Sequence, residues 1–215
     1  MIRYIFWDND GVLVDTEEGY FQATRGVLAE LGIGLEREPY MALRARGGTA
    51  WQLAEAAGVP PAAIEQHRAV RDERYQQFIR SREVEIPGAA QVVAALGRSH
   101  RMAVVTTSKR RDFEVIHRER RIVRHMEFVL TRENFARGKP APDGYLAALA
   151  RFGATPDQAV VVEDSKQGLD AARAAGVRCL IVHNGFFGSS HDFAGASGVL
   201  RSIDELPDAI ARLPG

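Results

Sequence analysis

The chain has 215 residues, of which 46% are hydrophobic and 26% charged, values that are ordinary for a soluble globular protein. Lys and Arg together number 28, as do Asp and Glu, so the chain lacks the basic excess that is common in nucleic-acid-binding proteins. No apolar run is long enough to span a membrane, and the first, residues 4–7, does not resemble a signal peptide. We therefore expect a cytoplasmic protein that binds neither nucleic acid nor membranes.

Five short, nearly continuous apolar runs predict strands that are buried on both faces, as in a parallel sheet. In chain order they cover residues 4–7, 102–106, 127–130, 159–162 and 178–182. The last contains Cys179, the single cysteine, which has no partner for an internal disulfide and which we expect in the core. Helices are predicted between the later strands, over residues 89–96, 143–152 and 165–175, the last with Ser165 as its N-cap. This alternation predicts a doubly wound α/β sheet.

The segment between the first and second strands breaks this alternation. Its apolar periodicity predicts four helices, over residues 17–31, 39–45, 50–57 and 61–79, separated by turns rich in glycine or proline. A purely helical block at this place indicates an inserted cap domain. We therefore predict an α/β core domain of residues 1–15 and 87–215, and a small helical cap domain of residues 16–86.

Polar side chains stand where the predicted strands end, which is where ligands of open α/β sheets bind. They are Asp8 and Asp10 after the first strand, Thr106, Thr107 and Ser108 at the second, Lys139 in the following loop, and Glu163 and Asp164 at the fourth. Carboxylate oxygens suit Mg²⁺, which also binds substrate phosphate, so Asp8, Asp10 and Asp164 are candidate ligands.

The same residues suit phosphoryl transfer. A carboxylate can accept a phosphoryl group and form an aspartyl-phosphate. Lys139 would supply a compact positive charge that holds nucleophile and phosphate together. The hydroxyl of Thr106 and the backbone N–H groups after it, at Thr107 and Ser108, would donate hydrogen bonds to the phosphate oxygens. Ser108 and Lys109 open the next predicted helix, where N–H groups favour anions.

Four motifs, in order, resemble those of the haloacid dehalogenase-like hydrolases. The sequence FWDNDGVLVDTE at residues 6–17 resembles the first motif, DxDGxLxDTE, and Thr106 fits the second. The sequence GKPAPD at residues 138–143 resembles the third, and VVVEDS at residues 160–165 resembles the fourth. The resemblance covers nearly the whole chain. It implies a magnesium-dependent phosphatase of small phosphate esters, with the helical cap found in phosphoglycolate phosphatases and β-phosphoglucomutase.

The resemblance also implies a role for each acid. Asp8 would be the nucleophile, and Asp10 the general acid and base, with its backbone carbonyl as a metal ligand. Asp164 would be the second main metal ligand, and Glu163 would assist it or lie in the outer shell. Thr106 and Lys139 would complete the catalytic set.

The same fold is compatible with three alternative functions. Dehalogenases lack the second acid, which is present here as Asp10, so that activity is disfavoured. β-Phosphoglucomutase carries a histidine in the cap hinge where this chain has Tyr20, which counts against a mutase. A non-catalytic phosphate-binding regulatory protein would be expected to lack a key acid or Lys139, and none is missing.

Substrate selection is expected to depend on the cap, where an Arg can bind a carboxylate or second phosphate. The candidates are Arg44, Arg46 and Arg71, and a solvated helix charge is the alternative for each. A capped enzyme of this size needs no partner to close its site, so we expect a monomer, with a homodimer as the alternative.

Three further features carry expectations of their own. Residues 109–125 hold seven Lys or Arg against three acids, which indicates a solvated helix face. Asn9 stands where the family usually has an apolar residue, and we expect it to affect packing only. The six histidines show no metal-ligand spacing.

Overall fold

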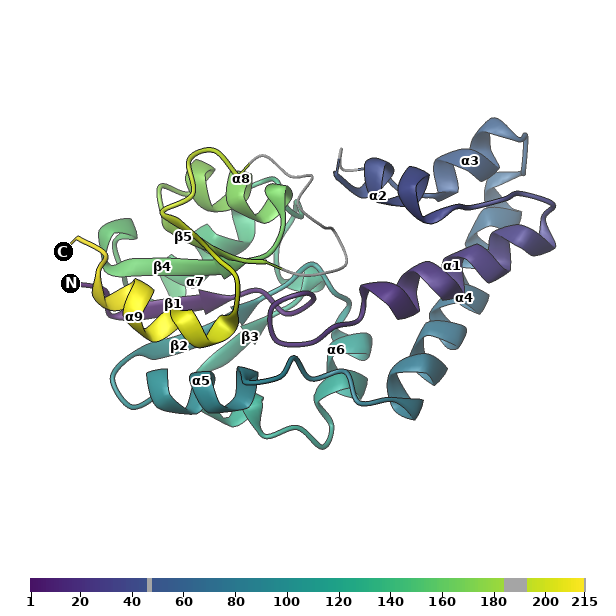
Figure 1. The fold of residues 1–215 in the computed structure, drawn as a ribbon. Helices are drawn as coiled ribbons and strands as arrows, with labels where there is room; N and C mark the ends of the chain where they lie inside the picture. The colour runs from purple at the N-terminus through teal and green to yellow at the C-terminus, as the bar shows by residue number, and fades with distance from the viewer. Residues whose placement is uncertain (46–47, 184–192, 215) are drawn as a thin grey trace. The chain divides into compact units, whose positions relative to one another are not determined.

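The computed structural model describes residues 1–45, 48–183 and 193–214 (Figure 1). The chain divides into two compact units. The core unit consists of Met1–Asp15 and Glu85–Gly215, and the helical unit of Thr16–Val84. None of the helices in the described ranges combines the length and apolar character needed to cross a bilayer.

The core unit is built on a six-stranded parallel sheet with the strand order β3-β2-β1-β4-β5-β6. The strands are β1 Tyr4–Trp7, β2 Arg101–Val105, β3 Phe128–Leu130, β4 Ala159–Glu163, β5 Arg178–Val182 and β6 Gly198–Leu200. In the register of the sheet, Tyr4 lies opposite Arg101 on β2 and Ala159 on β4. The predicted parallel α/β sheet is confirmed, and its first five strands match the predicted ranges to within one residue at each end. The edge strand β6 was not predicted because three residues carry no readable periodicity.

Helices cover both faces of the sheet (Figure 1). They are α5 Ala89–Leu96, α6 Arg110–His117, α7 Asp143–Phe152, α8 Lys166–Ala174 and α9 Leu206–Ala211, with short 3-10 turns η1 Ile122–His125, η2 Arg132–Asn134, η3 Pro156–Gln158 and η4 Ile203–Glu205. Side chains alternate across a strand, so Ile5 and Trp7 pack with α5 and α9, whereas Phe6 packs with α7 and α8. Burial on both faces explains why the strands are continuously apolar rather than alternating.

Two expectations about individual core residues are met. The Ser165 hydroxyl accepts a hydrogen bond of 3.0 Å from the Gly168 N–H and caps α8. Cys179 is buried in the apolar cluster that α7 and α8 form with the sheet. The capped start of α8 matters for the site because it follows directly on the acidic end of β4.

The helical unit consists of α1 Glu17–Glu30, α2 Arg37–Ala45, α3 Trp51–Ala56 and α4 Pro61–Ser81. Aromatic side chains join these helices: the Tyr20 and Tyr75 rings meet edge to face at 5.4 Å between centroids, and Phe21 lies 5.1 Å from Tyr40. Such pairs add to the stabilisation from burial alone. The unit therefore has a small core of its own.

Candidate active site

The order of the strands brings the predicted acidic residues together. In the sheet, β1 lies between β2 and β4: the chain adds β2 and β3 on one side of β1 and then crosses to add β4 on the other. Open α/β sheets bind ligands at such a reversal of strand order. Asp8 follows β1, and its N–H donates to the Val162 carbonyl of β4 at 2.9 Å. Glu163 ends β4 and Asp164 follows it. Carboxylate oxygens of Asp8, Glu163 and Asp164 lie within 4.8 Å of one another, and all three residues are buried.

Lys139 joins this cluster from the loop that precedes α7. Its ammonium lies 2.7 Å from Oδ1 of Asp8 and 2.6 Å from Oε1 of Glu163, and its side chain is only 8% exposed. Burial alone would lower the pKa of Lys139, but the two carboxylates outweigh it and raise that pKa above its usual range. Lys139 is therefore a fixed positive charge beside the Asp8 carboxylate.

The same surroundings act on Asp8 in the opposite sense. Burial, together with the nearby charge of Glu163, raises the pKa of Asp8 to about 7, although Lys139 opposes the rise. Among the described residues, the Lys139 ammonium contacts two of the three clustered carboxyl groups, so the cluster can still bind a further positive charge. A set of closely spaced carboxylate oxygens is the donor set that a hard divalent cation prefers, so the cluster fits such an ion.

The carboxyl group of Glu163 is held in place by hydrogen bonds from neighbouring side chains. The Tyr145 hydroxyl of α7 donates to Oε1 at 2.8 Å, while the Ser165 hydroxyl donates to Oε2 at 3.0 Å. The first turn of α8 presses against this carboxyl group, since a Cβ on Gly168 would lie 1.8 Å from Cδ of Glu163. Both oxygens of Glu163 are already engaged, so Asp8 and Asp164 are the better donors for a metal.

Asp10 lies outside the carboxylate cluster that the described residues form, and has a different set of contacts. It precedes Gly11, whose φ of 83° requires a glycine and turns the chain sharply after β1. Oδ2 of Asp10 accepts hydrogen bonds from the Ser108 hydroxyl and, at 3.5 Å, from the Thr106 hydroxyl. The Thr106 hydroxyl in turn accepts from the Ser108 N–H at 3.0 Å. The end of β2 therefore holds the side chain of Asp10.

The chain is similar to known proteins over most of its length. The family model described as haloacid dehalogenase-like hydrolase matches residues 5–182. The chain belongs to the haloacid dehalogenase-like hydrolases. It falls in the group of CbbY, phosphoglycolate phosphatase-like and β-phosphoglucomutase-like proteins, which confirms the predicted subfamily, and its relatives include phosphatases.

Three comparisons illustrate the likeness of this hydrolase to its relatives. Protein CbbY of Cereibacter sphaeroides is 35% identical, over 96% of this chain and 94% of that protein. The fructose-1-phosphate phosphatase YqaB of Escherichia coli is 30% identical, over 80% of this chain and 92% of its own length. The crystal structure of CbbY from Rhodobacter sphaeroides in complex with phosphate matches with a TM-score of 0.81, at 31% identity over 96% of both chains. The parallel sheet with α1–α4 as a helical cap is the fold of these hydrolases, so the predicted fold class is confirmed.

Thr107 is placed near the lysine loop of the hydrolase. Its side chain is exposed, and its Cγ2 lies 3.3 Å from where a Cβ on Gly138 would stand. The loop that carries Lys139 is ordered by Asp143, which accepts hydrogen bonds from the backbone N–H of Arg137 at 3.1 Å and from its guanidinium at 2.7 Å. The residues predicted to bind phosphate thus come from two neighbouring loops.

Two residues that contact Asp10 directly or through one neighbour, Asn9 and His117, were not predicted from the sequence as part of the site. Asn9 is fully buried, and its amide donates to Oδ2 of Asp10 at 3.2 Å, while its Oδ1 lies 2.7 Å from Nε2 of His117. The expectation that Asn9 affects packing only is therefore wrong. His117 is the last residue of α6 and shares its buried face with Phe113 and Ile116, a helical spacing that the sequence does contain.

The cap arginines have different surroundings within the helical unit. Arg71 is buried, with Nε 2.8 Å from Asp72 and its guanidinium 4.2 Å from the centroid of the Tyr20 ring, so it is not a solvated helix charge. Its Nη1 is buried without a hydrogen-bond partner among the described residues. Arg44 forms an ion pair of 3.0 Å with Glu17. Arg46 lies outside the described residues.

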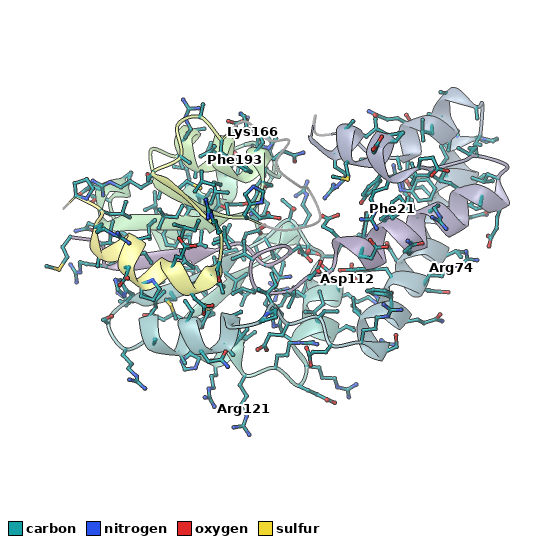
Figure 2. The ribbon with its side chains drawn as sticks, in the orientation of Figure 1. Phe21, Arg74, Asp112, Arg121, Lys166 and Phe193 are labelled. Atoms are coloured by element: carbon teal, nitrogen blue, oxygen red, sulfur yellow. The ribbon has the colours of Figure 1, made fainter. Side chains whose placement is uncertain are left out.

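The basic segment spans α6 and η1 rather than one helix. Its exposed basic side chains are Lys109, Arg110, Arg111, Arg118, Arg121 and Arg124, and Figure 2 shows Arg121 extending away from the ribbon. The solvated face that the charge pattern predicted is therefore present. The same helix also has a buried face, which carries His117.

Proposed function

We propose that this hydrolase is a magnesium-dependent phosphatase that releases phosphate from a small phosphomonoester through an aspartyl-phosphate on Asp8. The observation that carries the proposal is the contact of Asp8 with Lys139, next to Asp164, at the switch point of the sheet. Lys139 opposes the rise in pKa that burial and Glu163 impose on Asp8, and so favours the ionised carboxylate that a nucleophile requires.

The reaction follows from the residues in two steps. In the first, a carboxylate oxygen of Asp8 bonds to phosphorus, the bond from phosphorus to the alcohol oxygen breaks, and the Asp10 carboxyl gives its proton to that oxygen. In the second, water attacks phosphorus, its proton passes to Asp10, and the bond between phosphorus and Asp8 breaks. Asp10 ends each turnover in its starting state.

The remaining core residues would bind the phosphoryl group. Thr106, Thr107 and Ser108 at the end of β2 would donate hydrogen bonds to its oxygens, and Lys139 would pair with its charge. Asp8 and Asp164, with the backbone carbonyl of Asp10, would hold Mg²⁺, while Glu163 would position Lys139 and assist. When bound, the metal supplies positive charge that offsets repulsion between the Asp8 carboxylate and the phosphate.

We further propose that the helical segment, residues 16–86, is a cap domain that selects the substrate. Arg44, Arg46 and Arg71 are its candidate contacts with a second anionic group. The relatives favour a sugar phosphate as the first class to test, because YqaB is a fructose-1-phosphate phosphatase and a mutant of CbbY was crystallised with xylulose-(1,5)bisphosphate. Phosphoglycolate is the next candidate.

Phosphate release from a panel of sugar phosphates, sugar bisphosphates and phosphoglycolate, with and without Mg²⁺, tests the proposal. Asp8→Asn should abolish release, and Asp10→Asn should slow it by about 10²–10⁴-fold, the usual scale of general acid–base catalysis. Substantial activity in Asp8→Asn, or equal activity after chelation of Mg²⁺, would refute the mechanism. Isomerisation of a sugar phosphate without phosphate release would instead indicate a mutase.

A further inference from the structure

A chain of hydrogen bonds connects the proposed general acid to helix α6. It runs from Oδ2 of Asp10 to the amide of Asn9 at 3.2 Å, and from Oδ1 of Asn9 to Nε2 of His117 at 2.7 Å. Asn9 and His117 are both buried, so water does not compete for these bonds. Neither residue has a part in the two steps of the proposed reaction.

The chemistry of the donors decides how the protons in this chain are arranged. An oxygen of the Asp10 carboxylate accepts hydrogen bonds, so the NH₂ group of Asn9 must face it and the amide oxygen must face His117. That oxygen also only accepts, and Nε2 of His117 must therefore carry a hydrogen. Burial lowers the pKa of His117 to about 4, so the ring is neutral near pH 7 and its single N–H is on Nε2.

The other ring nitrogen shows that this arrangement has a cost. Nδ1 of His117 is buried and has no hydrogen-bond partner among the residues that the structure describes. A buried polar atom without a partner is destabilising, and an apolar side chain packed against Phe113 would avoid that loss. A functional role for the contact from Nε2 to Asn9 would explain why a histidine stands here despite this loss of stability.

We propose that Asn9 and His117 are positioning residues, which hold the Asp10 carboxyl group in the orientation that protonates the leaving oxygen. This inference rests on the proposed function. Asn9, Ser108 and Thr106 all donate to Oδ2 of Asp10, so the carboxyl group is held through this oxygen. His117 fixes the amide plane of Asn9, and Asn9 fixes the plane of the carboxyl group.

Two kinds of ester separate this role from a merely structural one. The alkoxide of an alkyl phosphate is a poor leaving group and needs the proton from Asp10, whereas p-nitrophenyl phosphate releases the stable p-nitrophenolate anion and does not need that proton. The ratio kcat/KM reports the steps up to the first irreversible one, which here is transfer to Asp8. A misplaced Asp10 should therefore affect kcat/KM for the alkyl ester alone.

The experiment compares wild type with Asn9→Leu and His117→Phe at saturating Mg²⁺. The substrates are p-nitrophenyl phosphate and the alkyl ester that the wild type hydrolyses fastest. Both variants should lose about tenfold or more in kcat/KM for the alkyl ester and stay within about twofold for the aryl ester. His117→Gln, whose amide can donate to Asn9, should recover part of the loss. His125→Phe makes the same type of change on η1, next to Arg124, and should match the wild type.

Several outcomes would overturn the inference. An equal loss on both esters would show a structural role, and wild-type values on both would show no role. His117→Phe keeps an aromatic ring in place, so it carries the test if Asn9→Leu does not fold, as judged by its circular dichroism and melting temperature. Failure of the wild type to release phosphate from either ester would refute the proposed function itself, and is thereby distinguishable from failure of the positioning role.

Discussion

Replacing Lys139 with methionine removes the ammonium that contacts both Asp8 and Glu163, while it keeps an unbranched side chain of similar length. The three side chains are between 0 and 11% exposed, so solvent screens their interaction little. Removing one partner from such a buried ion pair leaves uncompensated charge and costs about 3–5 kcal/mol. For a chain of this size, 1 kcal/mol corresponds to roughly 2–4 °C, so the melting temperature should fall by about 6–20 °C.

The assay is thermal unfolding of the metal-free protein in the presence of a chelator, measured by calorimetry at several pH values. The pKa of Asp8, about 7 in the wild type, should rise further once the positive charge has gone. In the folded variant Asp8 then keeps its proton up to a higher pH than in the wild type, so the stability of the variant falls further as the pH rises. The difference between Lys139→Met and wild type should therefore be larger at pH 9 than at pH 5.

The matched control is Lys166→Met, which removes an ion pair of 2.5 Å with Asp170 in which both side chains are about one-third exposed. Such a pair contributes at most about 1 kcal/mol, so this variant should melt within about 4 °C of the wild type. Equal melting temperatures for the two variants would refute the reasoning. If the difference in melting temperature between Lys139→Met and the wild type became smaller as the pH rises, the inference that Lys139 stabilises the negative charge of Asp8 would be refuted.

Three other changes give separate predictions. Asp164→Ala should raise the Mg²⁺ concentration for half-maximal activity at least about tenfold, and an unchanged requirement would move the metal elsewhere. His117→Phe should reduce the loss of stability on acidification. The wild-type ring has a pKa near 4 in the folded state and 6.5 when unfolded, so the wild type should lose up to about 3 kcal/mol of stability between pH 6.5 and 4 because of this ring. Denaturation at several pH values measures the loss, and the same dependence of stability on pH in both proteins would contradict this reasoning. Gly168→Ala should destabilise the core unit by about 1–3 kcal/mol in chemical denaturation, because its Cβ would collide with Glu163, and wild-type stability would count against that packing.

Much of the fold follows from local patterns. The continuous apolar runs identified five strands because burial on both faces excludes polar residues from them. The edge strand β6 was missed because three residues are too few for a pattern. For helix α6 the sequence predicted a start after the second strand and a solvated charged face, but not the buried face that carries Phe113, Ile116 and His117.

The candidate site divides in the same way. Asp8, Asp10, Glu163 and Asp164 were predicted because they lie within three residues of the end of an apolar run, and the ends of parallel strands meet at one edge of the sheet. Lys139 was predicted from its motif, but its contact with Glu163 was not. How Glu163 is held depends on Tyr145 from another helix, which no local pattern connects to it.

The sequence by itself therefore determined the parallel sheet, the inserted helices and the set of acids, because these are properties of neighbouring residues. Only the tertiary structure decided which charges pair and what holds Asp10. Asn9 and His117 are 108 residues apart, and their contact exists because β1 and α6 pack in one core. A hydrogen bond depends on distance and direction in space, and separation along the chain reveals neither.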